Sequence, residues 1–167
     1  YTNPASFICL ITSGVILGAS PDGITDNGIM IEIKSPYSRK IDGLVPSNYW
    51  VQMQLQLEVC NLELCHFVEI EASFYKNEYE YNNDNLFDEK NNYKGIIIKC
   101  SNDSGKSEYI YPNINIFKSN ELLNTWKLNT IDNYKFKYTN IEVCYWKVKK
   151  YSCVEITRDK NWFDSNL

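Results

Sequence analysis

Three ionisable residues near the start of the chain have the types and the spacing that phosphate chemistry requires. Asp22 lies between Ser-Pro and Gly in a sequence typical of a turn, where its carboxylate can point away from a packed sheet. Glu32 and Lys34 follow in a short apolar segment, two residues apart, so a strand presents both side chains on one face. If the turn folds over that strand, two carboxylates and one ammonium group meet.

Such a meeting of charges predicts metal-assisted hydrolysis of a phosphodiester. Two neighbouring carboxylates repel each other unless a cation neutralises them, and Mg²⁺ takes oxygen ligands while keeping several waters. The cation polarises the phosphoryl oxygen and lowers the pKa of a bound water, and Lys34 can orient that water or stabilise charge on the phosphate. Taken singly, each motif also fits a plain turn or a strand with a solvated face.

The elements that must position these residues follow from the hydrophobic pattern. Apolar runs at 7–11 and 15–19 predict two strands around a turn, and the alternating segment 29–34 predicts a third strand that stops before a proline. After Pro46 the period becomes helical to about Cys60, with Ser47 as the cap. One side of this helix is predicted to carry Tyr49, Gln52, Met53 and Gln56, and another side Val51, Leu55 and Leu62.

The remainder of the chain predicts further strands and one more helix. We expect strands at 65–74, 141–148 and 151–156, a hairpin formed by 93–100 and 108–116, and a helix from Asn120, its cap, to about Thr130. The acidic, Tyr- and Asn-rich segment 74–93 is interpreted as a surface excursion. The predicted fold class is α/β (α+β), with a mixed β-sheet flanked by helices in one domain.

Three blocks of sequence resemble one family of nucleases. An Asp in a Pro-Asp turn, followed by acid-x-Lys on a strand, resembles the PD-(D/E)XK nucleases. In residue types and in their order, the sequence resembles the YqaJ-like viral recombinase family of the phage lambda exonuclease type. The similar blocks are Gly-Ala-Ser-Pro-Asp-Gly-Ile at 18–24, Ile-Glu-Ile-Lys-Ser-Pro at 31–36 and Tyr-Trp-Val-Gln-Met-Gln-Leu-Gln-Leu at 49–57. The resemblance covers about 15–71, and nothing specific follows 74.

The resemblance implies a role for each matching residue. Asp22 and Glu32 would be metal ligands together with the backbone carbonyl of Ile33, and Lys34 would be the catalytic lysine. Gln52 would contact the scissile phosphate or the water. Gln54, on another side of the helix, would contact either the DNA backbone or a neighbouring element. The residues expected to contact DNA are Ser20, Ser35, Arg39, Lys40, Tyr49, Gln54 and Gln56.

The same resemblance implies a fold and an activity. The fold would be a restriction-endonuclease-like PD-(D/E)XK core at 1–74, with 75–167 completing the domain and the N-terminal helices of that core missing. The activity would be an exonuclease that uses Mg²⁺, or Mn²⁺ as a substitute, on double-stranded DNA in viral DNA recombination and repair. A single-strand annealing protein and a homo-oligomer are the implied partners. The alternatives are a non-catalytic DNA- or protein-binding module that retains the nuclease fold, and a related endonuclease.

One family feature is absent from this sequence. In the family a helix before the hairpin supplies another acidic residue, and none of residues 1–19 is acidic. We therefore expect the 167 residues alone to bind Mg²⁺ or Mn²⁺ weakly and to cleave DNA poorly.

Composition limits the compartment and the partners. No apolar run is long enough for a membrane span, and the start of the chain lacks the layout of a signal peptide, so we expect no membrane. Six scattered cysteines indicate a reducing compartment, which predicts an intracellular location: the host cytoplasm or a viral factory, with the nucleus also open. The net charge of -4 argues against unspecific coating of nucleic acid, although 127–160 holds eight basic and four acidic residues.

Two further groups of residues have both a functional and a plain interpretation. Cys60, Cys65 and His66 could begin a zinc or iron-sulfur site, but no second paired motif accompanies them, and a half-buried histidine is the favoured interpretation. The second group could line a DNA path or could be a solvated strand face with core aromatics, which is favoured. It consists of Lys147, Lys149 and Lys150 with Tyr145, Trp146 and Tyr151.

Overall fold

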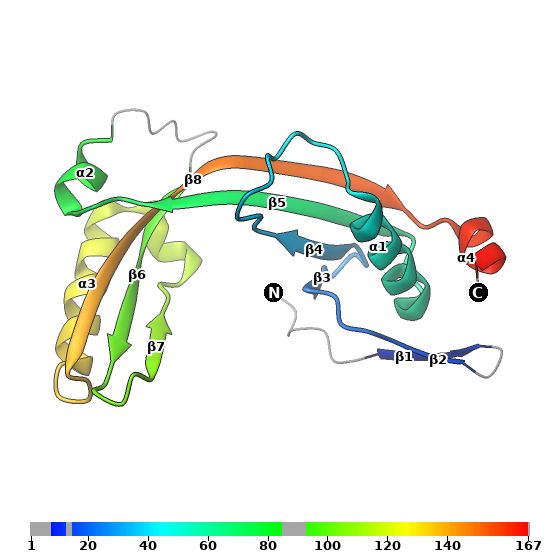
Figure 1. The fold of residues 1–167 in the computed structure, drawn as a ribbon. Helices are drawn as coiled ribbons and strands as arrows, with labels where there is room; N and C mark the ends of the chain where they lie inside the picture. Colours follow the sequence, from blue (N-terminus) through cyan, green and yellow to red (C-terminus); the bar gives the residue numbers. More distant parts are fainter. Residues whose placement is uncertain (1–7, 13–14, 85–92, 167) are drawn as a thin grey trace. The chain divides into compact units, whose positions relative to one another are not determined.

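The computed structural model of the chain describes residues 8–12, 15–84 and 93–166. It is a mixed α+β structure with a mixed β-sheet flanked by helices, as the pattern predicted (Figure 1). The chain divides into two compact units. Unit 1 comprises Tyr1–Glu71 with Lys150–Leu167, and unit 2 comprises Ala72–Lys149. The predicted core at 1–74 therefore shares its unit with the C-terminal segment.

The strands of unit 1 follow the predicted order closely. β1 (Ile8–Thr12) and β2 (Val15–Ala19) form an antiparallel two-stranded sheet. β3 (Gly23–Ile24) pairs antiparallel with β4 (Met30–Lys34), and β4 pairs parallel with β5 (Leu64–Phe74). The turn between β3 and β4 closes through a bond from the Gly28 N–H to the Thr25 carbonyl, and Gly28 has a φ of 79°, which glycine adopts without strain.

α1 (Ser47–Cys60) is the crossover that the parallel pair β4 and β5 requires. Its inner side places Met53 and Leu57 against Met30, Cys65 and Phe67, which form the buried core of this unit. The predicted side-chain cap at the first helical residue is wrong. Pro46 occupies the cap position, and its carbonyl accepts the N–H groups of residues 49 and 50.

The C-terminal end of the chain adds a helix that the pattern did not predict. α4 (Lys160–Asn166) places Trp162 edge-to-face against Trp50 of α1, with ring centroids 5.1 Å apart. Among the described residues, no helix has the length and apolar character needed to cross a membrane.

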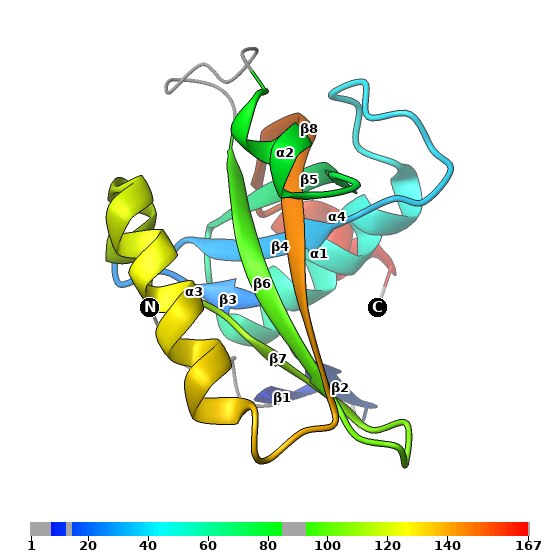
Figure 2. The same ribbon diagram turned by 90° about the vertical axis from the view of Figure 1, so that its left-hand side faces the viewer.

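Unit 2 is an antiparallel arrangement covered by one long helix (Figure 2). β6 (Lys94–Ser101) lies between β7 (Ser107–Ile110) and β8 (Asn140–Thr157), which continues into unit 1. α3 (Asn120–Tyr134) packs Leu123 and Trp126 against Ile96 and Tyr81. Gly95 lies where Phe117 and Trp146 pack together, and an added Cβ would come within 2.5 Å of the Phe117 ring.

Several predicted boundaries in unit 2 are wrong, each for a local reason. The strand expected at 108–116 ends at Ile110, because a proline follows at 112, and Ile114–Lys118 is a 3₁₀ helix (η1). The two strands expected at 141–148 and 151–156 are the single strand β8, since neither glycine nor proline separates them.

Two smaller differences concern helix starts and the acidic segment. Ser119, rather than Asn120, caps α3 by accepting the N–H of Leu122. The segment expected as a surface excursion contains α2 (Glu78–Asn82), which buries Tyr81 against Ile96 and Leu123. Residues 85–92 of that segment lie outside the described residues.

Candidate functional site

Glu32 is the centre of a buried polar cluster between β4 and α1. Its side chain is almost fully buried, yet its two oxygens accept three side-chain donors. Lys34 Nζ and Gln52 Nε2 both donate to Oε1, the latter over 2.8 Å, and Gln56 Nε2 donates to Oε2 over 3.1 Å. Because a buried carboxylate is costly unless it is paired and hydrogen-bonded, this site is built to hold a negative charge.

The two glutamines reach Glu32 because they lie one turn apart on α1. Residues four apart share a helix face, and the predicted face of Gln52 and Gln56 is the one that meets β4. Tyr49, one turn earlier, packs its ring against Phe67 with centroids 5.8 Å apart. Lys34 Nζ lies 5.1 Å from the centre of the Tyr49 ring, so the predicted residues of α1 and β4 are brought together.

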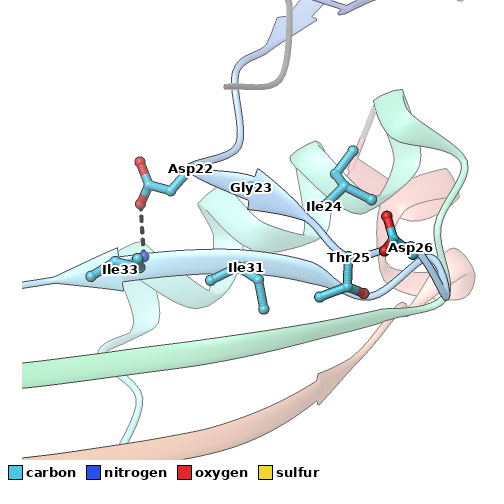
Figure 3. Close-up of a pocket in the computed structure, with 7 residues that line it drawn as sticks. All are labelled: Asp22, Gly23, Ile24, Thr25, Asp26, Ile31 and Ile33. Atoms are coloured by element: carbon cyan, nitrogen blue, oxygen red, sulfur yellow. Dashed lines mark hydrogen bonds between the residues drawn. The ribbon is translucent and has the colours of Figure 1, made fainter. Parts of the chain in front are cut away.

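Asp22 is bonded to the backbone of β4, between the two residues of that strand that belong to the cluster. Its Oδ2 accepts the Ile33 N–H over 2.7 Å, which ties the turn to the residue between Glu32 and Lys34 (Figure 3). In a strand the N–H and C=O of one residue point to the same side, so the Ile33 carbonyl is directed to the edge where Asp22 lies. Two carboxylates and this carbonyl are oxygen donors of the kind that Mg²⁺ takes.

A pocket lies on the other face of β4. It has a volume of about 460 Å³ and is bordered by Asp22, Ile24, Ile31 and Ile33 (Figure 3). Successive side chains on a strand alternate, so Ile31 and Ile33 point away from the face of Glu32 and Lys34. Asp22 is therefore a pocket residue that is also bonded to the strand edge. Among the described residues, no three His, Cys, Asp or Glu side chains gather closely enough to hold a metal ion.

The charges of both carboxylates reach one buried thiol. Cys65 lies beside Met30 in the register of β4 and β5 and is fully buried. Burial first, and then the negative charges of Glu32 and Asp22, raise the pKa of this thiol to about 12. A thiol with so high a pKa is almost entirely protonated at neutral pH.

This thiol gives the first testable expectation. Only the thiolate reacts with iodoacetamide, so at pH 8 we expect Cys65 to be alkylated much more slowly in the folded chain than in the urea-unfolded chain. The rate in the folded chain should rise as the pH approaches 12. Peptide mapping by mass spectrometry measures both rates, and the exposed Cys153 is the control that should react in both states. Equal rates for Cys65 in the two states would contradict the burial described.

The other predicted contact residues have different surroundings. Gln54 is buried and holds a neighbouring element: its Nε2 donates to the Thr157 carbonyl over 3.0 Å, and its Oε1 accepts the Asp159 N–H over 2.7 Å. Of the two roles considered for Gln54, this is the contact with a neighbouring element. Ser20, Ser35 and Lys40 are exposed, and Arg39 bonds to Glu69.

Glu69 is a site residue that the sequence interpretation missed. It is fully buried on β5, opposite Lys34 in the parallel register. The sequence does contain a pattern that indicates the burial of Glu69. Cys65, Phe67 and Glu69 are at alternate positions of one strand and so share a face, and the two apolar residues indicate that this face is buried.

The cysteine-histidine group and the lysine-aromatic group, which each had two interpretations, have the following surroundings. Cys65 is buried, whereas the adjacent His66 points to the other face, where its Nε2 lies 3.6 Å from Glu155. Tyr145 packs against Tyr81, and Trp146 packs against Phe117. Tyr145 and Trp146 of this group thus take part in packing, whereas Tyr151 is exposed. Lys147 Nζ donates to Asp84 over 2.8 Å and lies over the Tyr75 ring.

Comparisons with known proteins add a viral relative. No family model matches the chain. The chain is 28% identical over 191 aligned residues to a protein of Acanthamoeba polyphaga mimivirus, "Uncharacterized protein R354". The alignment covers 90% of this chain and 35% of the relative, so the chain spans about a third of the length of the curated relative that it matches.

Proposed function

We propose that this chain carries a PD-(D/E)XK nuclease core of the YqaJ-like viral recombinase type and hydrolyses phosphodiester bonds of double-stranded DNA. The bond from the Ile33 N–H to Asp22 carries the proposal, since it links the turn carboxylate to the strand that bears Glu32 and Lys34. The order of elements agrees with it: a short antiparallel pair, a crossover helix and a parallel strand.

Mg²⁺, or Mn²⁺ in its place, is the proposed cofactor. Asp22, Glu32 and the Ile33 carbonyl would hold it, and their hard oxygen atoms suit either cation. Bound there, the cation would polarise the phosphoryl oxygen and make water more acidic.

Lys34 and Gln52 are the proposed catalytic groups. Both donate to the same oxygen of Glu32, so their donor atoms lie next to each other. When a phosphate enters, Lys34 would stabilise the charge that develops on it, and the Gln52 amide would orient the attacking water. Preorganised donors of this kind contribute without rearrangement during the reaction.

The biological setting is proposed from the relative and from the resemblance. A mimivirus relative is consistent with a viral source, and the proposed role is that of an exonuclease in viral DNA recombination and repair. Work beside a single-strand annealing protein, assembly into a homo-oligomer, and location in the host cytoplasm or a viral factory belong to the same proposal.

One observation favours a second candidate, a non-catalytic binding module on the same fold. Glu32 already has three donors, and among the described residues no three His, Cys, Asp or Glu side chains lie close enough together to hold a metal ion. A domain that retains the nuclease fold and binds DNA or protein without cutting would tolerate such an arrangement. A related endonuclease is the alternative among enzymes.

A cleavage assay with two DNA forms tests the proposal. Linear duplex and closed circular DNA are each incubated with the chain and Mg²⁺, Mn²⁺, Ca²⁺ or EDTA, and Asp22→Ala is purified in parallel. An exonuclease shortens only the linear form, and only with Mg²⁺ or Mn²⁺. Cutting of the circle supports an endonuclease. Absence of both cleavage and Mn²⁺ uptake supports the module, and undiminished cleavage by Asp22→Ala would overturn the assignment of the site.

A further inference from the structure

Glu69 is a buried acid that the proposed reaction does not use. Its side chain is fully buried on β5, and Oε1 accepts a donor from Arg39 Nη2. Its other oxygen, Oε2, is buried and has no hydrogen-bond partner among the described residues. A buried carboxylate that is only half satisfied costs stability, so packing alone is a poor reason for its presence.

Arg39 is held in one place by three contacts, one of which is the bond from its Nη1 to the Lys40 carbonyl over 3.4 Å. Besides the Glu69 carboxylate, the Tyr49 ring lies 5.9 Å from the centre of the guanidinium group. Glu69 fixes one end of the planar group and the ring lies along it, an arrangement that arginine adopts readily. Arg39 reaches the site from the segment between β4 and α1, so the buried acid also anchors that segment.

Lys34 and Arg39 therefore present two cations around one aromatic ring. Lys34 Nζ lies 5.1 Å from the same Tyr49 ring, and Lys34 is the register partner of Glu69. The two cations are compensated separately, Lys34 by Glu32 and Arg39 by Glu69. The Arg39 side chain is still 35% exposed, and most of its five N–H donors are not used by Glu69.

We propose that Glu69 is a positioning residue that acts through Arg39, holding the guanidinium group beside Lys34 so that it binds a DNA phosphate next to the one being cleaved. This inference rests on the proposed function. Arginine recognises phosphate through parallel N–H bonds, which require a fixed orientation of the guanidinium plane. The carboxylate in β5 supplies that orientation from below the surface, and contacts no DNA itself.

Binding of a duplex in Ca²⁺ tests the inference without cleavage. The variants are Glu69→Gln, which keeps shape and removes charge, and the double variant Glu69→Gln with Arg39→Gln, which removes both members of the pair. Glu69→Gln leaves only the charge of Arg39, whose side chain is 35% exposed, and the double variant removes the whole pair, so both variants are expected to fold. Glu155→Gln, an exposed acid of the same unit, is the matched control.

The expected result is a loss that the two residues share. Glu69→Gln should weaken binding about tenfold, the value of one charge-assisted contact, and should lower the salt slope by about 0.9. The double variant should be weaker than Glu69→Gln by no more than about twofold, because Arg39 is already unpositioned. Glu155→Gln should bind as the unchanged chain does.

Other results overturn the inference. If Glu69→Gln binds as tightly as the unchanged chain, the acid does not position the phosphate contact. If the double variant loses a further tenfold over Glu69→Gln, Arg39 acts without the acid. The unchanged chain separates the two proposals. If it binds and cleaves DNA while either of these two results is found for the variants, only the inference on Glu69 fails. If the unchanged chain neither binds nor cleaves, the proposed function fails and the inference with it.

Discussion

Replacing Lys34 with methionine is expected to lower the rate of Mn²⁺-dependent DNA cleavage by about 10²–10⁴-fold, the usual contribution of a positioned proton-transfer or charge-stabilising group. The ammonium group is the one cation among the described donors to Glu32, and the other two donors, Gln52 and Gln56, are neutral amides that cannot replace it. Single-turnover cleavage of a labelled linear duplex measures the rate.

The fold should survive this substitution. Stability should fall because the buried Glu32 loses its cationic partner, but Glu32 keeps its two amide donors, and methionine is an unbranched side chain of similar length. Lys106→Met, at an exposed position in the β6–β7 turn, is the matched control and should cleave at the unchanged rate. A Lys34→Met variant that cleaves within about threefold of the unchanged chain would remove Lys34 from the reaction.

Arg39→Gln alone is expected to lower the free energy of unfolding by about 3–5 kcal/mol, because it leaves the buried charge of Glu69 without its partner. The double variant Glu69→Gln with Arg39→Gln should recover most of this loss, since no buried charge remains. Urea denaturation followed by circular dichroism gives both free energies.

The neighbouring residue provides the control for this effect. Lys40 is exposed on the same segment, and Lys40→Gln should change the free energy of unfolding by no more than about 0.5 kcal/mol. If Arg39→Gln is as stable as the unchanged chain, or if the double variant is no more stable than Arg39→Gln, the buried charge of Glu69 is compensated in some other way.

The parts of the site that could be predicted from the sequence depend on local periodicity. The period of two places Glu32 and Lys34 on one face, and the helical period places Gln52 and Gln56 on one face, whatever the rest of the chain does. The turn at Asp22 follows from proline and glycine chemistry. These features need no knowledge of which strands pair.

The parts that escaped prediction depend on contacts between distant segments. Gln54 is buried because the chain beyond β8 returns to it more than a hundred residues later, and no local pattern reports such a contact. β8 was divided in two because its exposed lysines interrupt the apolar pattern, although they do not interrupt the strand. Arg39 and Glu69 meet across thirty residues for the same reason.

The shared carboxylate of Glu32 has a consequence for α1. Gln52 and Gln56 of α1 both donate to the Glu32 carboxylate. A ligand that binds this carboxylate in their place would therefore break both of these hydrogen bonds between α1 and β4 at once. Binding of a ligand at Glu32 would then change how tightly the turn of α1 between Gln52 and Gln56 packs on β4. The packing of α1 would in this way depend on whether a ligand is bound at Glu32.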